Sequence, residues 1–245
     1  DKAVADFYYT LPRIAIEQFT TRCLIDEILL TNDIEGVHST RKEIGEILQD
    51  LSSHNKRNRF VGLIAKYTML KYRQSISFKT CQDIRKIYDD IFYEEIKATD
   101  PDNLPDGEIF RRSGVEVQSA TQKVIHKGLM PESKIIETFE QSLSVLNNND
   151  IDIFIRIAIF HYLFGYIHPF YDGNGRTSRF ISSYLLSRQL TPLIGFRLSY
   201  TIKENISKYY RAFDVCNNTH NKGELTPFVD MFLSIVEISM QQLAE

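Results

Sequence analysis

The chain has 245 residues, with 29 Lys or Arg against 32 Asp or Glu, so its formal net charge is −3 at neutral pH. Hydrophobic residues make up 43% and charged residues 25%, which is ordinary for a globular protein with a substantial core. The acidic excess argues against a nucleic-acid binder that relies on bulk phosphate attraction, and the three scattered cysteines, Cys23, Cys81 and Cys216, predict a reducing, cytoplasmic environment.

The first hundred residues carry apolar side chains at helical spacing. Thr40 and Glu43 have the spacing of a capping box, at the start of a helix whose apolar face runs to Leu51. Further apolar stripes predict helices over 60–67 and 84–91. The short basic run 56–59 is typical of a solvated face rather than of a binding patch.

The middle of the chain changes character. Residues 94–107 hold Pro101, Pro105 and several acids, and they predict an exposed loop. Over 113–126, Val115 and Val117 alternate with polar residues before a turn at 119–121, which predicts a β-hairpin. Pro131 then opens a helix with four residues directed inward: Ile135, Phe139, Leu143 and Leu146.

The most apolar run, 151–167, is interrupted by Asp152, Arg156 and His161 and stops before Pro169. A membrane span needs about 20 residues with few charges, so this run predicts a buried central helix and no membrane partner. The first three residues lack an apolar core with a cleavage site, and we expect no signal peptide.

Three more helices are expected over 176–190, 202–217 and 227–243, the last with Thr226 as N-cap. The sequence therefore predicts an all-α fold, a helical bundle around the central apolar helix with one β-hairpin.

The segment between two of these helices is rich in chemistry: His168-Pro169-Phe170-Tyr171-Asp172-Gly173-Asn174-Gly175-Arg176-Thr177-Ser178-Arg179. Its Gly-Asn-Gly run allows left-handed backbone and a nest of inward N–H groups. The helix that follows adds its positive end to the same place, and its two arginines, three apart, share one face. With a carboxylate and a histidine, these are the parts that phosphoryl-type transfer needs. The alternative is a loop that only turns the chain.

This segment resembles the signature of Fic-domain proteins, His-Pro-Phe-x-Asp-Gly-Asn-Gly-Arg-x-x-Arg, and matches it at every specified position. The resemblance implies the Fic fold, with an N-terminal helical region over 1–74 and a Fic domain with C-terminal helices over 75–245. It also implies an adenylyltransferase that uses ATP as substrate and Mg²⁺ as cofactor. Such an enzyme moves AMP to a Ser, Thr or Tyr hydroxyl of a target protein and releases pyrophosphate.

Carried over position by position, the resemblance implies that His168 is the base that takes the hydroxyl proton and that Asp172 holds the metal. The residues implied to bind phosphates are Gly173, Asn174, Gly175, Arg176 and Arg179, the last of these on the γ-phosphate.

Two regions outside the signature extend the resemblance. Tyr210 and Asn217, seven apart on one helix, resemble an adenosine pocket, although such residues are also ordinary at a core boundary. The 113–126 hairpin resembles the family's flap, on which a target protein docks by strand addition.

The run Thr31-Asn32-Asp33-Ile34-Glu35-Gly36 resembles the family's inhibitory motif. The resemblance implies that Glu35 pairs with Arg179 and blocks the γ-phosphate position, with Thr31 bonding a neighbouring group one turn earlier. Gly36 is suited to end the helix.

Alternatives stay open at this point. Glu35 could instead orient a water that removes AMP from a modified target, or the chain could be a non-catalytic interaction module. Self-modification and an oligomer are further open points, as is the identity of the target. We expect His161 to be a core residue, and His38, His54, His126 and His220 to lie at the surface.

Overall fold

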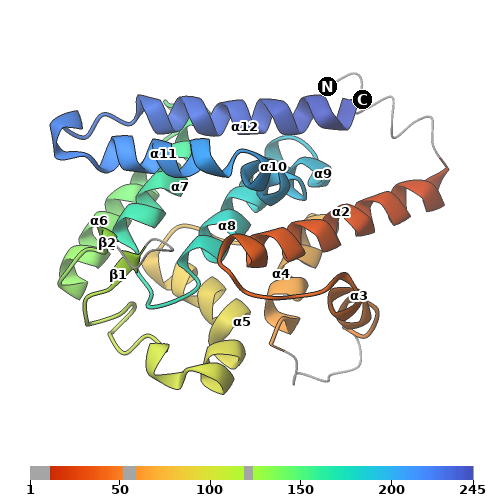
Figure 1. Cartoon of the computed structure of the whole chain (residues 1–245), viewed down its shortest axis with the longest axis horizontal. Helices are drawn as coiled ribbons and strands as arrows, with labels where there is room; N and C mark the ends of the chain where they lie inside the picture. The colour runs from red at the N-terminus through yellow and green to blue at the C-terminus, as the bar shows by residue number, and fades with distance from the viewer. Residues whose placement is uncertain (1–11, 52–58, 119–123, 245) are drawn as a thin grey trace.

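The computed structural model describes residues 12–51, 59–118 and 124–244, and it is helical apart from one two-stranded hairpin (Figure 1). The predicted all-α class is therefore confirmed. In chain order the elements are α2 (Arg13–Ile34), α3 (Arg41–Gln49), α4 (Val61–Lys71), α5 (Cys81–Thr99), η1 (Pro101–Asn103), β1 (Glu116–Gln118), β2 (Val124–Lys127), α6 (Glu132–Leu146), α7 (Ile153–Ile167), α8 (Asn174–Gln189), α9 (Pro192–Gly195), α10 (Leu198–Glu204), α11 (Ile206–Asn217), η2 (Thr219–Asn221) and α12 (Thr226–Ala244).

Helix α7 lies at the centre of the bundle, packed against α6, α8 and α12 (Figure 1). It starts where the Asp152 carboxylate accepts the Phe154 N–H at 2.9 Å, and its Phe160 and Phe164 are fully buried. The predicted central apolar helix is thus confirmed. In the described part of the chain, no helix is both long enough and apolar enough to cross a membrane.

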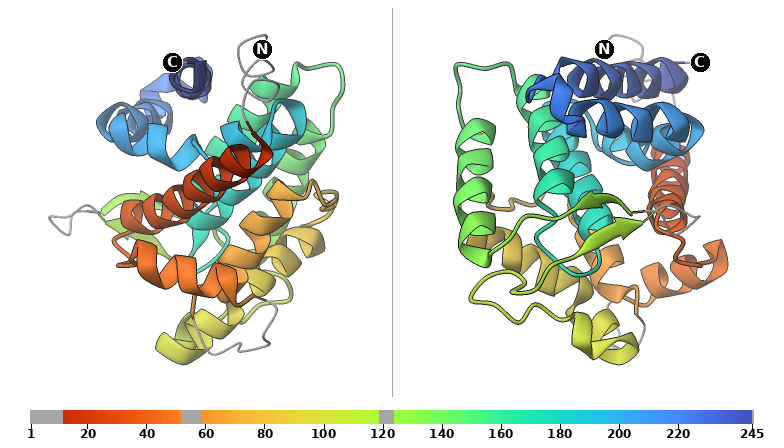
Figure 2. Two further views of the ribbon diagram at one scale, coloured as in Figure 1. Left: turned by 90° about the vertical axis from the view of Figure 1, so that its right-hand side faces the viewer. Right: turned by 60° about the vertical axis from the view of Figure 1, so that its left-hand side comes forward.

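Helix α2 runs along one side of the bundle, against α10, α4 and α8 (Figure 2). One hydrophobic core joins these helices to the rest of the fold, while the division at residue 74 stays a prediction. Helix α3 begins as expected, because the Thr40 hydroxyl accepts the Glu43 N–H at 3.1 Å.

Several boundaries differ from the sequence prediction. Helix α5 continues to Thr99, so the expected loop at 94 begins only at Asp100, and Glu95 lies inside the fold. The single helix expected over 202–217 is two helices, α10 and α11, which meet at Asn205. Helix α12 begins at Thr226 itself, whose N–H and hydroxyl both donate to the Glu224 carboxylate.

The hairpin is confirmed as an antiparallel pair in which Glu116 faces Lys127 and Val117 faces His126. Its register shifts between Val117 and Gln118. The turn expected at 119–121 lies outside the described residues, as do His54 and most of the basic run 56–59.

Helices α2 and α8 run antiparallel and are joined by a ridge of polar contacts. Glu27, Thr31 and Glu35 are spaced four apart at the C-terminal end of α2, and they face Ser183, Arg179 and Gly175, also spaced four apart, on α8. Side chains with this spacing lie on one face of a helix. The ridge therefore fixes the register of α2 along α8.

Glu27 is a fully buried carboxylate in this ridge. It accepts the Ser199 N–H at 2.8 Å and the Ser199 hydroxyl at 2.6 Å, and longer bonds come from the hydroxyls of Ser183 and Tyr67. Burial raises the pKa of Glu27 to about 7, although these hydrogen bonds and the charge of Arg179 oppose the rise. One buried carboxyl thus links α2 to α4, α8 and α10.

We expect the stability of the fold to fall between about pH 5 and pH 8 because of Glu27. Between about pH 5 and pH 7 the folded state keeps most of the proton, because its pKa is about 7, whereas the unfolded chain, with a pKa of 4.5, has lost it. The difference of about 2.5 pKa units corresponds to about 3 kcal/mol. Urea unfolding of wild type and Glu27→Gln at pH 5 and pH 8 measures this contribution.

Glutamine fits the site, because its carbonyl can accept the Ser199 N–H while the surrounding hydroxyls rotate to accept from its amide. Relative to wild type, Glu27→Gln should gain about 3 kcal/mol on going from pH 5 to pH 8. Glu17→Gln, an exposed change on the same helix, should show no such gain. Parallel pH profiles for wild type and Glu27→Gln would refute a raised pKa at Glu27.

Candidate active site

His168 stands at the end of α7 in a left-handed conformation, with φ of 53°. Its N–H donates to the Phe164 carbonyl at 3.0 Å, and its ring Nδ1 lies 3.3 Å from the Gly165 carbonyl oxygen. A carbonyl can only accept, so Nδ1 carries the proton and Nε2 is left with a free lone pair. Burial lowers the pKa of His168 to about 4, and the imidazole is neutral at physiological pH.

Phe170 and Asn174 hold the loop after His168 in place. Phe170 is fully buried, and its ring stacks on Tyr88 with centroids 3.6 Å apart. The Asn174 side chain accepts the Phe170 N–H at 2.9 Å and donates to the Phe170 carbonyl at 2.8 Å. Gly173 makes the turn between them with φ of +77°, a conformation that glycine adopts without steric cost. The Asn174 amide therefore shapes the loop.

Helix α8 begins at Asn174, two residues earlier than predicted, so Asn174, Gly175 and Arg176 form its first turn. The N–H groups of a first turn have no partner within the helix, and they carry its positive end. This turn, the cradle, is the place where the sequence predicts anion binding.

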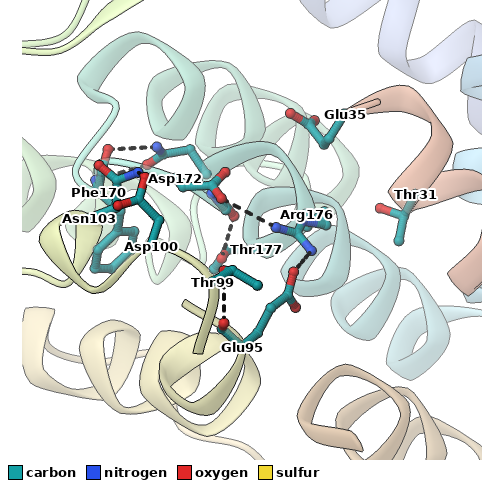
Figure 3. A network of polar contacts seen from close by, with 12 residues as sticks. Thr31, Glu35, Glu95, Thr99, Asp100, Asn103, Phe170, Asp172, Arg176 and Thr177 are labelled. Carbon is teal, nitrogen blue, oxygen red and sulfur yellow. Dashed lines mark hydrogen bonds and ion pairs between the residues drawn. The ribbon is translucent and has the colours of Figure 1, made fainter. Parts of the chain in front are cut away.

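Asp172 lies at the edge of this cradle, with a side chain 54% exposed. One carboxylate oxygen accepts the Gly173 N–H at 2.5 Å, and the other lies 3.7 Å from Arg176 (Figure 3). Within the described residues, no three His, Cys, Asp or Glu side chains gather as an all-protein metal site.

Arg176 is buried, and its guanidinium is paired with Glu95 of α5 at 2.7 Å (Figure 3). It also lies over the Phe92 ring, 4.4 Å from the centroid. The Arg176 side chain thus points to α5 and connects the start of α8 to that helix. Its main-chain N–H belongs to the cradle. Phosphate binding by the Arg176 guanidinium stays a prediction.

Arg179, one turn further along α8, reaches the end of α2. Its guanidinium donates to the Thr31 hydroxyl at 2.8 Å, to the Thr31 carbonyl at 3.0 Å and to the Glu35 carboxylate at 2.7 Å. Glu35 is the last residue before Gly36, which ends the helix with φ of +71°. The predicted partners, 144 residues apart in sequence, are in direct contact.

The Glu35 carboxylate rests on the cradle itself. A Cβ atom at Gly175 would overlap Oε1 of Glu35 and approach Nη1 of Arg179 to 3.0 Å. Burial acts to raise the pKa of Glu35, but the charge and hydrogen bond of Arg179, with smaller effects of Arg176 and His168, lower it below the ordinary value. Glu35 is therefore held as an anion against the first turn of α8.

The two predicted adenosine residues lie on α11 but apart from each other. Tyr210 is 45% exposed, whereas Asn217 at the end of the helix accepts a 2.8 Å hydrogen bond from the Tyr162 hydroxyl. Seven residues of helix separate them by about 10 Å. Their role as an adenosine pocket stays a prediction.

Of the discounted histidines, His161 is a core residue as expected, bonded to Ser182 and Tyr209 at 2.8 Å each. His126 was expected at the surface and is instead half-buried, with Nε2 2.6 Å from the Tyr166 carbonyl oxygen. Its strand lies against the end of α7.

Two buried residues of the site were missed by the sequence reasoning, Glu95 and Arg111. Glu95 continues the apolar stripe Ile84, Tyr88, Ile91 of α5, and a carboxylate at such a position requires a buried partner. Arg111 donates to the His168 carbonyl at 2.9 Å, and no local pattern marks this contact between residues 57 apart.

Comparison with known proteins agrees with this geometry. Residues 78–186 match the model of the Fic/DOC family. The chain is 30% identical over 234 residues to the Protein adenylyltransferase Fic of Aedes aegypti, an alignment that covers 91% of this chain and 42% of that protein. It is 29% identical over 211 residues to the Drosophila melanogaster protein of the same name, covering 83% and 39%. The chain thus spans less than half the length of these curated relatives.

Solved structures agree on the fold. A Fic family protein from Desulfovibrio desulfuricans superposes with a TM-score of 0.69 at 20% identity, covering 98% of this chain and 70% of that one. Fic-1 from C. elegans gives a TM-score of 0.61 at 22% identity, covering 99% and 68%. The signature loop, the fold and the family match point the same way: residues 78–186 of this chain form a domain of the Fic/DOC family.

Proposed function

We propose that this protein transfers AMP from ATP to a hydroxyl side chain of a target protein, and that Glu35 holds it in an inhibited state. The observation that carries the proposal is a neutral His168 beside a helix N-terminus on which a carboxylate paired with Arg179 already rests. The relatives named protein adenylyltransferase Fic support the transfer of AMP rather than its removal. The intact site disfavours a non-catalytic module.

In the proposed reaction, Nε2 of His168 takes the proton of the target hydroxyl. The hydroxyl oxygen bonds to the α-phosphorus of ATP, and the bond from that phosphorus to the bridging oxygen breaks. Pyrophosphate leaves, and the product is a phosphodiester of AMP on the target. Above its pKa of about 4, His168 has the free lone pair that a base needs.

The residues at the cradle fit Mg²⁺ as a partner of ATP. This ion is typically held by one or two carboxylates together with substrate phosphates rather than by an all-protein cage. Asp172, exposed at the cradle edge, is the carboxylate available for it. When bound, the ion would neutralise phosphate charge, while Gly173 and Asn174 shape the loop that presents Asp172.

Glu35 and ATP compete in this proposal for the same place. A γ-phosphate bound by Arg179 would need the guanidinium that now holds Glu35, and two anions cannot share that position without repulsion. With the γ-phosphate displaced, the α-phosphorus is not in line with the target hydroxyl.

The target docks, in this proposal, along the 113–126 hairpin. Val124 and Ile125 of β2 have exposed side chains, 37% and 46%, and a two-stranded sheet offers open edges for a further strand. The hairpin base lies beside His168, so a strand added there would bring its hydroxyl toward the base.

The function is tested with ATP radiolabelled at either the α- or the γ-phosphate, Mg²⁺ and the Glu35→Gly protein. We expect the α-label to become covalently attached to protein, the γ-label to appear as pyrophosphate, and neither to transfer without Mg²⁺. Transfer of the γ-label would instead indicate a kinase. Loss of the attached label when wild-type protein, which keeps Glu35, is added without ATP would indicate removal of AMP.

Asp172→Ala should weaken Mg²⁺-dependent nucleotide binding and stop transfer, because it removes the carboxylate that lies exposed at the cradle edge and that would hold the ion together with the phosphates. Calorimetric titration of Mg-ATP into Glu35→Gly and Glu35→Gly/Asp172→Ala measures the loss. Asp230→Ala, which removes an exposed acid on α12, is the matched control in the same Glu35→Gly background. Equal Mg-ATP affinity in all three proteins would exclude Asp172 as the metal-binding residue.

A further inference from the structure

Arg111 is a fully buried cation whose side chain bonds to main-chain carbonyls. Its Nε donates to the His168 carbonyl at 2.9 Å, its Nη1 to the Ser113 carbonyl at 2.5 Å and its Nη2 to the Leu129 carbonyl at 3.0 Å. A guanidinium presents its donors in a rigid planar fork, so the three acceptors are held in a fixed arrangement.

The three carbonyls belong to parts of the protein that the proposed reaction must bring together. Ser113 precedes β1 and Leu129 follows β2, so they are the two ends of the hairpin. His168 carries the proposed base. The main chain of Arg111 adds a fourth connection, because its N–H donates to the Pro169 carbonyl at 3.3 Å.

Gly128 shows how closely these parts are packed. A Cβ atom there would overlap Nη2 of Arg111 and come within 3.1 Å of the His168 Cβ. The strand leaving the hairpin thus runs directly against both Arg111 and His168. Leu129 adds a hydrogen bond of 3.1 Å from its N–H to the Ile167 carbonyl, at the last residue of α7.

We propose that Arg111 is a positioning residue, which sets His168 and both ends of the hairpin in one rigid frame so that a docked hydroxyl meets the base. The inference rests on the proposed transfer of AMP and adds to it a residue outside the signature loop. His168 needs such support because its φ of 53° is uncommon for a residue other than glycine.

The charge of Arg111 has a second, separable effect on His168. The charged and titratable groups that act on the imidazole are His126 on β2, Arg111 before β1 and Glu35 at the end of α2. Burial is the main cause of the lowered pKa of His168, and the positive charge of Arg111 lowers it further. Removing that charge should raise the pKa of His168, whereas a substitution that keeps the charge should not.

The test compares Arg111→Lys and Arg111→Met in the Glu35→Gly background. Lysine keeps the charge but loses the planar fork, and methionine loses both. We expect both variants to label themselves from ATP on the order of 10²-fold more slowly at saturating ATP, as for misplaced reacting groups. The ATP concentration that gives half the maximal rate should stay unchanged. Arg112→Lys and Arg112→Met, at the exposed neighbouring position, should label at the parent rate.

A second readout does not depend on activity. The His168 ring is titrated by NMR in the Arg111 variants with Glu35 intact, its signals being assigned by their loss in His168→Ala. The pKa of His168 should rise in Arg111→Met and stay unchanged in Arg111→Lys. If the Glu35→Gly parent protein does not label itself from ATP, the proposed function is refuted. The titration still tests whether Arg111 acts on His168.

Three results would overturn the positioning role. The first is a folded Arg111→Lys that labels at the parent rate. The second is a rate loss in both variants that disappears at saturating ATP, which would place the effect of Arg111 on nucleotide binding rather than on the position of the base. The third is loss of cooperative unfolding in both Arg111→Lys and Arg111→Met, which would make the residue structural only.

Discussion

Replacing His168 with alanine should abolish AMP transfer in the Glu35→Gly background while leaving ATP affinity nearly unchanged. His168 acts on the hydroxyl proton in the transition state and adds little to the binding of the nucleotide. Loss of a general base costs about 10²–10⁴-fold in rate. The measurements are the rate of labelling from ATP radiolabelled at the α-phosphate and the dissociation constant for Mg-ATP.

The pH dependence of the same reaction provides a further check on the base. With a pKa of about 4, His168 is already deprotonated at pH 5, so its titration should not limit transfer between pH 5 and pH 8. The rate should fall only as the pH drops through that pKa, because protonated imidazole cannot accept the hydroxyl proton.

His161→Ala is unsuitable as a control for His168→Ala, since His161 is buried in the core. His220→Ala, on an exposed turn, is the appropriate one. Wild-type labelling by His168→Ala would refute the assigned chemistry.

Glu35→Gly should raise transfer by about 5–150-fold, the range of a two-state coupling of about 1–3 kcal/mol. The variant frees Arg179 and clears the space above Gly175, so that the triphosphate can place its γ-phosphate on the guanidinium. A charge-assisted pair with a buried arginine is stronger than an exposed ion pair, and its loss should therefore be measurable. The assay compares labelling rates of wild type and Glu35→Gly at one ATP concentration.

Two variants test whether activation by Glu35→Gly comes from freeing Arg179 or from a general loosening of α2. Asp33→Gly also removes an acid near the end of the helix, but its partner is the exposed Lys203 at 2.8 Å, so it should not activate. Glu35→Gly/Arg179→Ala removes the brake together with the phosphate contact and should stay slow. Equal rates for wild type and Glu35→Gly would exclude inhibition by Glu35 while leaving the transfer of AMP untouched.

The parts of the site that the sequence predicts are those whose geometry is local. The signature loop is twelve consecutive residues, and its turn at Gly173 and the helix after it follow from glycine conformations and apolar spacing. The contact of Glu35 with Arg179 spans 144 residues, and only the resemblance to a known motif predicted it.

The parts that could not be predicted depend on tertiary packing. Arg176 is a basic residue beside a phosphate motif, yet its guanidinium turns to Glu95, and this partner lies where the sequence predicts a loop. Arg111 resembles an ordinary charged residue before a hairpin until its carbonyl partners, up to 57 residues away, are brought together. The break at Asn205 is likewise invisible in periodicity, since apolar residues continue on both sides of it.

Because their contacts are matched in spacing, α2 and α8 act as one rigid unit in the proposed inhibition. Glu27 and Glu35 are about 12 Å apart on one continuous helix, and both engage α8 in a single register. A slide of α2 by one residue would unseat both carboxylates at once, so intermediate positions have no stable contacts. The proposed inhibition should therefore switch between two states rather than vary by degrees, and a change in the packing of Glu27 against Ser199 should also affect the contact of Glu35 with Arg179.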